Sequence, residues 1–578
     1  MTIKLRTANK IIPVIAAAFF FYAASDSFAQ NIPPGSQPGA EASRFQSESK
    51  KKEAALEKKA KTPEIKVEEE KPSQPAEKGP AFRLNGIKIT GITVFTQEEL
   101  KPLYQSYIDK EVTFDDVEKV VEAIKGEYKK KGFLIATAYI PEQDIKNGVV
   151  EIKVAEGKLG EVKVESNKYF KDSLIKNYIH VKKNEILNIL KLQRDILRLN
   201  QNPDLEVKTV IEPGKESETS DIILKTAGSF PYHFGYGFDT QGTRLTGKGR
   251  NSFSIRTTNF TGHNDTVFAN VQHSTFSTGE YVNYTLPVDT YGTKLGLTFS
   301  CFDMKLGGEF KQFDITGRTV TFTPYISKEL ALSEDFQSDL ELGLDAKSIK
   351  RKTAGQITSD DQLRMPYLDL NMSKIDTFFG GGQTTFSPRI EFSTSNFLGA
   401  SERDHPTSSR PGTGGFFFKY MQDVSRIQRM PFESMVSIRS HFESSSTILP
   451  SSEQLQLGGL NTVRGYPEGD YLADYGATLN IDWIFPCYLI PAKFKLPDQD
   501  VALRNQVLPV LFMDLGGGAL RKPQPGELNN KFLMGLGGGL RMSFKYCSIR
   551  LEWAGAVGDK PSSGNGPSTF YLAFQAEI

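Results

Sequence analysis

Apolar and polar residues alternate, one by one, through much of the second half of this chain. In 232–239 every second residue is Tyr or Phe, and in 477–483 every second residue is Ala, Leu, Ile or Trp. The side chains of a β-strand point alternately to its two faces, so each segment forms a strand with one apolar and one polar face. A wall with lipid on one side and water on the other requires this pattern.

About 16 such segments follow one another over 228–578, separated by turns rich in Gly, Asn, Asp and Ser. An even number of strands, each of roughly ten residues, is typical of a single-chain outer-membrane barrel, and about 16 strands leave a channel. The alternative is a soluble sandwich or propeller, which would place the inward acids and arginines in a dry core. We therefore predict a 16-stranded antiparallel transmembrane β-barrel over 228–578.

The composition argues against several other classes of protein. The chain has 70 basic and 69 acidic residues, which is not the balance of a protein that binds nucleic acid. Cys301, Cys487 and Cys547 lack metal-ligand spacing, and the six histidines are scattered. No Ser/His/Asp or paired-carboxylate cluster can be identified. We expect neither an enzyme nor a protein with a metal or cofactor.

The N-terminus has the features of a secretory signal peptide. Lys4, Arg6 and Lys10 precede the apolar run 11–24, and the small residues Ser27 and Ala29 mark a cleavage site. The alternative is a membrane anchor, but the apolar run is shorter than the span of about 20 residues that a helix needs. We predict a signal peptide over 1–29 and an exported mature protein.

A charged leader follows, over 30–80. It is rich in Pro, Lys and Glu and has almost no aromatic residues, so it cannot form a core of its own. Residues 43–61 could form a helix, because the run Glu53, Ala54, Ala55, Leu56 and Glu57 within them favours one. Two interpretations remain open: a solvated linker, or a detachable helix that occupies a pore or docks elsewhere.

Two small units lie between the leader and the barrel, over 81–156 and 157–227. In the first, Thr96 and Thr113 have the chemistry of helix N-caps, and apolar residues recur at helical spacing after each. Both units show the order strand, helix, helix, strand, strand, which is an internal repeat of topology. The pattern alone is also compatible with a pair of generic α+β domains.

Two motifs mark the barrel half. Val463-Arg464-Gly465-Tyr466 lies between the eleventh and twelfth predicted strands, and Phe512, Asp514 and Gly516 form Phe-x-Asp-x-Gly in the thirteenth. A Gly-rich run, 535–541, lies in the fourteenth. Taken alone, these are a turn with an arginine and two strands with glycines, which indicate bulges or close backbone approach.

Together, these features resemble the superfamily of outer-membrane barrels that assemble or secrete proteins. The first motif is similar to the tip of that superfamily's sixth extracellular loop, and the second to the inner-wall motif where the tip docks. The repeated units resemble POTRA domains. Two POTRA domains before a 16-stranded barrel, with a helix and linker ahead of them, resemble the two-partner secretion transporters of the hemolysin secretion/activation type. Barrels of this superfamily commonly end in Phe or Trp, whereas this chain ends in Ile578.

The resemblance implies an outer-membrane transporter with periplasmic N-terminal domains. Its POTRA domains would bind an unfolded secreted exoprotein (TpsA-like) and pass it through the barrel, and Arg464 would lie in the lumen, paired with Asp514. Outer-membrane lipid and the barrel-assembly machinery are the other expected partners. An insertase of the same superfamily is the alternative, although such relatives usually carry more POTRA domains. A passive porin or receptor would need neither the POTRA domains nor the loop motif.

Overall fold

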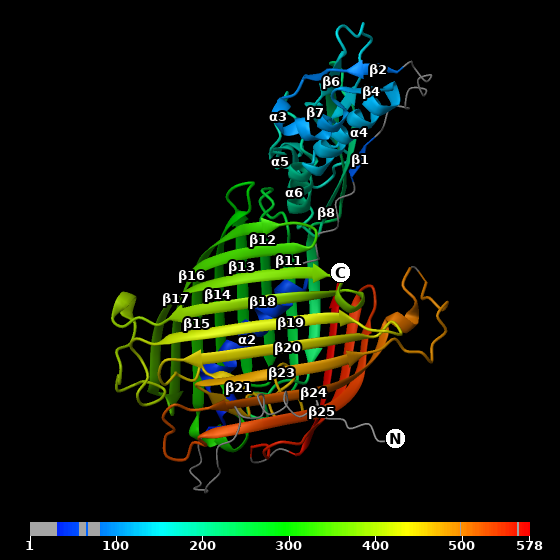
Figure 1. The fold of residues 1–578 in the computed structure, drawn as a ribbon. Helices are drawn as coiled ribbons and strands as arrows, with labels where there is room; N and C mark the ends of the chain where they lie inside the picture. The colour runs from blue at the N-terminus through cyan, green and yellow to red at the C-terminus, as the bar shows by residue number, and fades with distance from the viewer. Residues whose placement is uncertain (1–31, 57–64, 68–80, 498, 563–565) are drawn as a thin grey trace, which may run out of the picture.

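The computed structural model describes residues 32–56, 65–67, 81–497, 499–562 and 566–578. The predicted signal peptide and the end of the expected leader helix, 57–61, lie outside these residues. Figure 1 shows three parts: a helix in a barrel, two small α/β units beside one end of the barrel, and the barrel itself. No helix among the described residues is long and apolar enough to cross a membrane.

The barrel is closed and has sixteen antiparallel strands, which confirms the predicted fold. Closure comes from pairing of the last strand with the first, with Phe574 opposite Phe238. The strands are β10 (Tyr232–Asp239), β11 (Arg250–Thr257), β12 (Thr266–Ser274), β13 (Ser277–Pro287), β14 (Thr293–Lys305), β15 (Ile315–Leu332), β16 (Phe336–Thr353), β17 (Gln356–Asp376), β18 (Gly382–Phe392), β19 (Phe418–Arg429), β20 (Met435–Ser445), β23 (Tyr475–Ile484), β24 (Val507–Ala519), β25 (Asn530–Ser543), β26 (Cys547–Ala556) and β27 (Ser568–Glu577).

The alternation in the sequence separates the two faces of this wall. On β23, Leu479, Ile481 and Trp483 face outward, while Asn480 and Asp482 between them are buried in the interior. The outward face is therefore apolar and suits lipid, and the inward face is polar. A hairpin of β21 (Leu455–Leu457) and β22 (Tyr471–Ala473) lies between β20 and β23 and is not part of the wall.

The first small unit has a three-stranded sheet of order β3-β6-β5 and a separate β2-β4 pair. A capping box between Thr113 and Asp116 starts α4, which buries Val117, Val120 and Ile124 against the sheet. The helix expected from Thr96 onward is shorter than predicted, because Pro102 lacks the N–H needed to continue it and two 3₁₀ turns follow. The elements are β2 (Phe82–Leu84), β3 (Gly86–Thr90), α3 (Gln97–Leu100), β4 (Lys110–Val112), α4 (Phe114–Lys130), β5 (Thr137–Tyr139) and β6 (Val149–Ala155).

The second small unit repeats the strand, helix, helix, strand, strand order. It consists of β7 (Lys158–Glu165), α5 (Asp172–Asn177), α6 (Ile189–Leu199), β8 (Leu205–Pro213) and β9 (Thr219–Gly228). Its sheet has the order β1-β8-β9-β7, so a fourth strand from the leader, β1 (Ile65–Val67), lies parallel to β8. This added strand was not predicted, because three residues in a polar leader carry too little pattern.

The second unit is fixed to the barrel rim by polar contacts. Asp204 accepts hydrogen bonds from Thr258 and from His233, at 2.7 and 2.9 Å. Arg198 forms an ion pair with Glu329 at 2.5 Å. These contacts reach β10, the turn between β11 and β12, and the end of β15, so this end of the barrel is the one that carries the small units.

The leader helix α2 (Pro38–Leu56) lies in the lumen of the barrel (Figure 1). It begins before the predicted range 43–61, because Pro38 suits the first turn of a helix, where its missing N–H is not needed. Ala42 and Phe45 pack in an apolar cluster with the wall, where the ring centroids of Phe45 and Phe302 are 5.6 Å apart. The other wall contacts of α2 are largely polar.

Candidate functional site

The segment 446–474, between β20 and β23, folds back into the barrel, and we call it the inward loop. Its tip, 458–466, contains Arg464 and Tyr466, both fully buried. At Gly465 the backbone φ is 97°, and a Cβ there would stand 2.8 Å from the Gly555 carbonyl carbon of β26. Glycine is therefore required at this position, both for its backbone conformation and for close contact with the wall.

Arg464 makes contacts with three carboxylates of the wall. Its Nε and Nη2 donate to Asp514 at 2.6 and 2.7 Å, Nη2 also donates to Asp482 at 2.5 Å, and Nη1 donates to Glu552 at 3.1 Å. The guanidinium carbon lies 3.5 Å from the centre of the Phe512 ring, which adds a cation–π contact. The structure thus brings the two predicted motifs together.

The strand pattern explains how β24 presents its motif. Phe512, Asp514 and Gly516 are alternate residues and all face the lumen, where all three are buried. Gly516 leaves room for the tip, since a Cβ there would stand 2.6 Å from Val463. Asp514 also accepts a hydrogen bond from Asn480 of β23 at 2.8 Å, which orients its carboxylate.

The glycines of β25 make this docking possible. A Cβ at Gly535 would stand 1.9 Å from the carbonyl oxygen of Arg464, and one at Gly537 would stand 2.6 Å from the Phe512 ring. The sequence indicated close backbone approach in this run but not which segment approaches. It is the tip of the inward loop.

Sequence reasoning missed several members of this cluster. Asp482 and Glu552 also bind arginines of the wall: Arg541 contacts both, at 3.0 and 2.7 Å, and Arg550 contacts Glu552 at 2.7 Å. A signal was available, because these residues occupy lumen-facing positions in the alternation of β23, β25 and β26. We call Arg464, Asp482, Asp514, Arg541, Arg550 and Glu552 the docking cluster.

Hydroxyl groups fasten the backbone of the tip. The N–H of Gly465 donates to the hydroxyl of Tyr571 on β27 at 3.0 Å, and that hydroxyl lies 3.3 Å from the Tyr466 carbonyl oxygen, to which it donates. Tyr466 and Val463 pack in an apolar cluster with Leu457 and Leu533. The tip is thus held by charge, by hydrogen bonds and by apolar packing.

Two further ion-pair clusters hold the two limbs of the inward loop. Glu453 accepts from Lys347 of β16 at 2.8 Å and from Lys419 of β19 at 3.2 Å. Asp474 forms an ion pair with Arg410 at 3.1 Å. All these side chains are buried, so their charges are compensated by partners rather than by bulk water.

Polar groups of α2 contact both the inward loop and the wall. Gln456 of the loop donates to the carbonyl oxygen of Ala40 at 2.7 Å, and Glu48 of α2 pairs with Arg250 of β11 at 3.0 Å. Near the end of the helix, Glu53 accepts from Asn283 of β13 at 2.8 Å. The helix and the loop therefore fill the lumen together.

No group of three or more His, Cys, Asp or Glu side chains that could hold a metal ion occurs in the described part of the chain. What the arrangement offers is a polar channel, an internal helix held by exchangeable contacts, and a loop clamped at its tip.

The model of the haemolysin secretion/activation protein family, ShlB/FhaC/HecB, matches residues 218–542, and that of the ShlB-type POTRA domain matches 82–157. The chain belongs to this family. It is an outer-membrane transporter of protein secretion with periplasmic POTRA domains, and not an enzyme.

Relatives and solved structures agree with the family assignment. The heme/hemopexin transporter protein HuxB of Haemophilus influenzae is 24% identical over 77% of this chain and 78% of its own. The outer membrane transporter CdiB of Dickeya dadantii is 22% identical over 68% and 70%. CdiB from Escherichia coli has the same fold, with a TM-score of 0.72, 20% identity and coverage of 96% of this chain and 100% of that one.

Proposed function

We propose that this transporter secretes one partner exoprotein of the TpsA-like class, and that α2 must leave the lumen for each passage. The units 81–156 and 157–227 act as POTRA domains that receive the exoprotein, after a signal peptide, 1–29, and a leader, 30–80. The barrel, 228–578, is the conduit. Arg464 and Asp514 keep the inward loop in the position that secretion requires.

The occupied lumen is the observation that carries this proposal. An unfolded chain cannot share the channel with a helix that contacts β11, β12 and β13 and also the inward loop. Most of these contacts are hydrogen bonds or ion pairs, which water replaces at small net cost, about 1 kcal/mol each. Release of α2 is more accessible than release of the loop tip, because the contacts of α2 are spread over separate wall residues, whereas Arg464 alone binds three buried carboxylates in one place.

The POTRA sheets offer edges for capture. In the first unit, β3 and β5 are the edge strands, and in the second unit β7 is one edge, with β1 at the other. Edge strands carry free N–H and C=O groups that pair with an extended peptide by β-augmentation. An unfolded exoprotein is such a peptide.

A reversible tether tests whether α2 leaves the lumen. Asn270 of β12 donates to the Ser49 hydroxyl at 3.1 Å, so Ser49→Cys with Asn270→Cys places two thiols within reach of a short bis-methanethiosulfonate cross-linker. We expect secretion of the exoprotein to stop on cross-linking and to return after reduction. Each single variant and the treated wild type, which keeps the three native cysteines, should secrete normally. Secretion through the tethered protein would refute the proposal.

We further propose that the barrel-assembly machinery and outer-membrane lipid receive this chain during biogenesis. The last strand, β27, forms the seam with β10, and the N–H of the terminal Ile578 donates to Phe234 at 3.0 Å. Ile578 thus extends the seam beyond β27 by backbone hydrogen bonds with Phe234. Ile578→Phe should leave the amount of barrel in the outer membrane unchanged, whereas deletion of the last strand should abolish it; quantitative blotting of membrane fractions measures both.

A further inference from the structure

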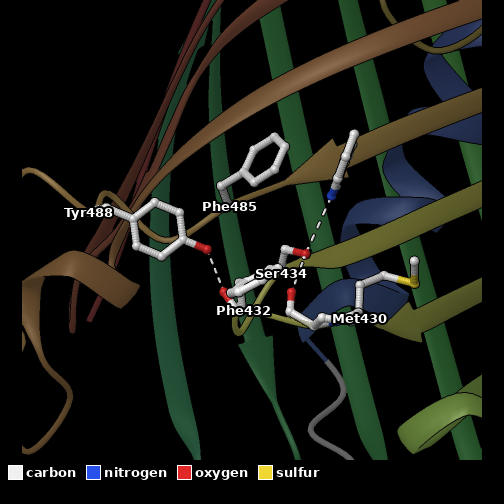
Figure 2. Close-up of a pocket in the computed structure, with 7 residues that line it drawn as sticks. Met430, Phe432, Ser434, Phe485 and Tyr488 are labelled. Carbon is white, nitrogen blue, oxygen red and sulfur yellow. Dashed lines mark hydrogen bonds between the residues drawn. The ribbon is translucent and has the colours of Figure 1, made fainter.

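An apolar groove of about 500 Å³ lies at the rim of the barrel that carries the POTRA units. It lies between the turn 430–434, after β19, and the long segment 485–506, after β23, which we call the rim loop. Since strands alternate in direction from β10, both connections are at the periplasmic end. The walls of the groove include Met430, Phe432, Trp483, Phe485 and Tyr488 (Figure 2).

The rim loop is folded onto the turn rather than free. The Tyr488 hydroxyl donates to the carbonyl oxygen of Phe432, and Arg504 pairs with Glu433 at 2.6 Å (Figure 2 shows the first contact). The indole N–H of Trp483 donates to Ser434 at 3.3 Å. The groove therefore has a fixed shape.

The turn and the loop nevertheless present large apolar side chains outward. Phe432 is 85% exposed and Leu489 is 95% exposed. Phe432 and its neighbour Glu433 have φ values of 60° and 57°, a left-handed conformation that non-glycine residues rarely adopt. A strained backbone that holds an aromatic ring in an exposed position indicates that the ring contacts another molecule.

The groove is continuous with the lipid-facing wall. Trp483 ends the outward row Leu479, Ile481, Trp483 of β23, and Phe485 extends it to the groove. Tryptophan at this level is typical of the interfacial aromatic girdle of a barrel. The lumen side of the same strand is formed by Asn480 and Asp482 instead, so the groove opens away from the path of a secreted chain.

Two cations flank the exposed apolar surface. Lys493 and Lys495 stand on either side of Phe494 in the rim loop, all three are exposed, and neither lysine forms an ion pair with any described residue. Lysines beside exposed aromatic and aliphatic residues are the composition of segments that lie in a lipid headgroup layer.

We propose that the rim loop is an interfacial membrane anchor. The turn 430–434 and the rim loop lie in the headgroup layer of the periplasmic leaflet, a phospholipid acyl chain occupies the groove, and Lys493 and Lys495 contact lipid phosphates. Because POTRA unit two is fixed to the rim near β11 to β15, the anchor and the POTRA units hold different sectors of the same rim.

Tryptophan quenching by brominated phospholipid tests this, since the chain has only Trp483 and Trp553. In a background of Trp483→Phe and Trp553→Phe, the full-length protein with Leu489→Trp is placed in vesicles of phosphatidylglycerol and phosphatidylethanolamine brominated near the headgroup end of the acyl chain. We expect this reporter to lose most of its emission. Adding Lys493→Glu and Lys495→Glu should reduce the quenching in anionic vesicles and change it little in purely zwitterionic ones.

Two controls use the same background. Glu334→Trp lies on the same rim in the polar turn after β15, and Lys215→Trp lies at the far end of the second POTRA unit; both should be quenched much less. Equal quenching of Leu489→Trp and Lys215→Trp would overturn the proposal. The proposal would also be overturned if the emission of Leu489→Trp were not quenched by brominated lipid but shifted to the blue on addition of the exoprotein. The surface would then be a contact for the substrate.

Discussion

At the scale of single residues, the docking cluster depends on a property that only arginine has. Arg464 uses Nε, Nη1 and Nη2 toward three different carboxylates, whereas lysine has a single ammonium group. Four arginines contact the three acids Asp482, Asp514 and Glu552, namely Arg439, Arg464, Arg541 and Arg550. Three of the four belong to the wall itself, so Asp482 and Glu552 keep cationic partners when the loop tip is changed, whereas Asp514 is paired with Arg464.

We therefore expect Arg464→Lys to behave like Arg464→Ala. Both should lose secretion while the amount of barrel in the outer membrane is retained, because removal of one partner from a buried pair costs about 3–5 kcal/mol and the strand ladder does not depend on it. Secretion assays, membrane fractionation and protease accessibility of the inward loop measure this. Arg318→Ala is the matched control, since its pair with Asp303 is exposed. Normal secretion by Arg464→Lys would show that a single charge suffices.

A reversed pair is not expected to restore function. In Arg464→Asp with Asp514→Arg, the new aspartate would face Asp482 and Glu552, both of which contact position 464 in the native protein. A simple salt bridge, as the sequence predicted, would tolerate the exchange. The cluster of several charges in the structure does not, which is a consequence of strands far apart in the sequence meeting on one wall.

A second residue-scale prediction concerns Glu156 in the first POTRA unit. Burial would raise the pKa of Glu156, but hydrogen bonds from the Thr93 hydroxyl and N–H, from the Val94 N–H and from the Tyr128 hydroxyl outweigh it and hold the pKa below its ordinary value. A depressed pKa in the folded state stabilises the unit above the ordinary pKa, and this stabilisation is lost as the pH falls through that range.

We expect Glu156→Gln to weaken the unit at neutral pH by about 1–3 kcal/mol, since an amide nitrogen would face N–H donors. The variant should also lose part of the destabilisation that the native unit shows on acidification. Hydrogen exchange of the α4 and β6 amides in the full-length protein, at neutral and at acidic pH, measures both effects. The exposed Glu122 provides a control, Glu122→Gln, which should change neither. A variant with native protection at both pH values would contradict the assignment.

At the scale of elements, the leader strand β1 occupies one edge of the second POTRA sheet. Its three residues pair in parallel with Thr209, Val210 and Ile211 of β8. That edge is one of the places where an extended exoprotein could add a strand. Both chains cannot use it at once, so the leader and the substrate compete there.

Proline at two successive positions should remove this competition. Of two neighbouring residues in a strand, one directs its N–H toward the paired strand, so Lys66→Pro with Val67→Pro removes a ladder bond whichever residue supplies it. We expect tighter binding of an N-terminal exoprotein fragment to the purified transporter, by several-fold in titration calorimetry. Lys66→Ala with Val67→Ala keeps both N–H groups and should bind as the native protein does. Equal binding by the two variants would exclude competition at β8.

Most elements could be predicted, and the exceptions have physical causes. The barrel strands follow from a period of two because lipid and water impose it on every residue of the wall, and the POTRA helices follow from caps and apolar spacing. Pro102 was present in the sequence but its effect on the helix after Thr96 was overlooked. Strand β1 had no local signal, since its pairing is determined by β8, far away in the chain.

The docking cluster could be predicted in part. The motifs indicated that Arg464 meets Asp514, but the contribution of Glu552 depends on the pairing register of β24, β25 and β26, since β26 is two strands from β24. The Gly-rich run in β25 is the residue pattern that allows the tip to reach across. Alternation predicts which side chains face the lumen, and the register between neighbouring strands decides which of them meet.

At the scale of the whole molecule, the lumen of the barrel is occupied by two segments of the same chain, α2 and the inward loop. The inward loop enters from the end opposite the POTRA units and is fixed at its tip by Arg464, which binds three wall carboxylates, whereas α2 is held by separate contacts such as Glu48 with Arg250 at 3.0 Å and Lys52 with Ser252 at 3.2 Å. We therefore expect α2 to leave the lumen and return to it, while the tip of the inward loop remains docked on the wall.

Deletion of α2, 38–56, tests this division. The barrel should still fold and reach the outer membrane, because its strands pair with one another and the wall groups that lose α2, such as Arg250 and Asn283, gain water in the lumen. We expect a larger and more constant single-channel conductance in planar bilayers, yet smaller than an empty barrel would give, since the inward loop remains. Glu48→Gln with Glu53→Gln only weakens the contacts of the helix. It should open the channel more often without raising the fully open conductance above that of the deletion. An unchanged conductance after deletion would mean that the inward loop alone closes the channel, and that α2 has another task.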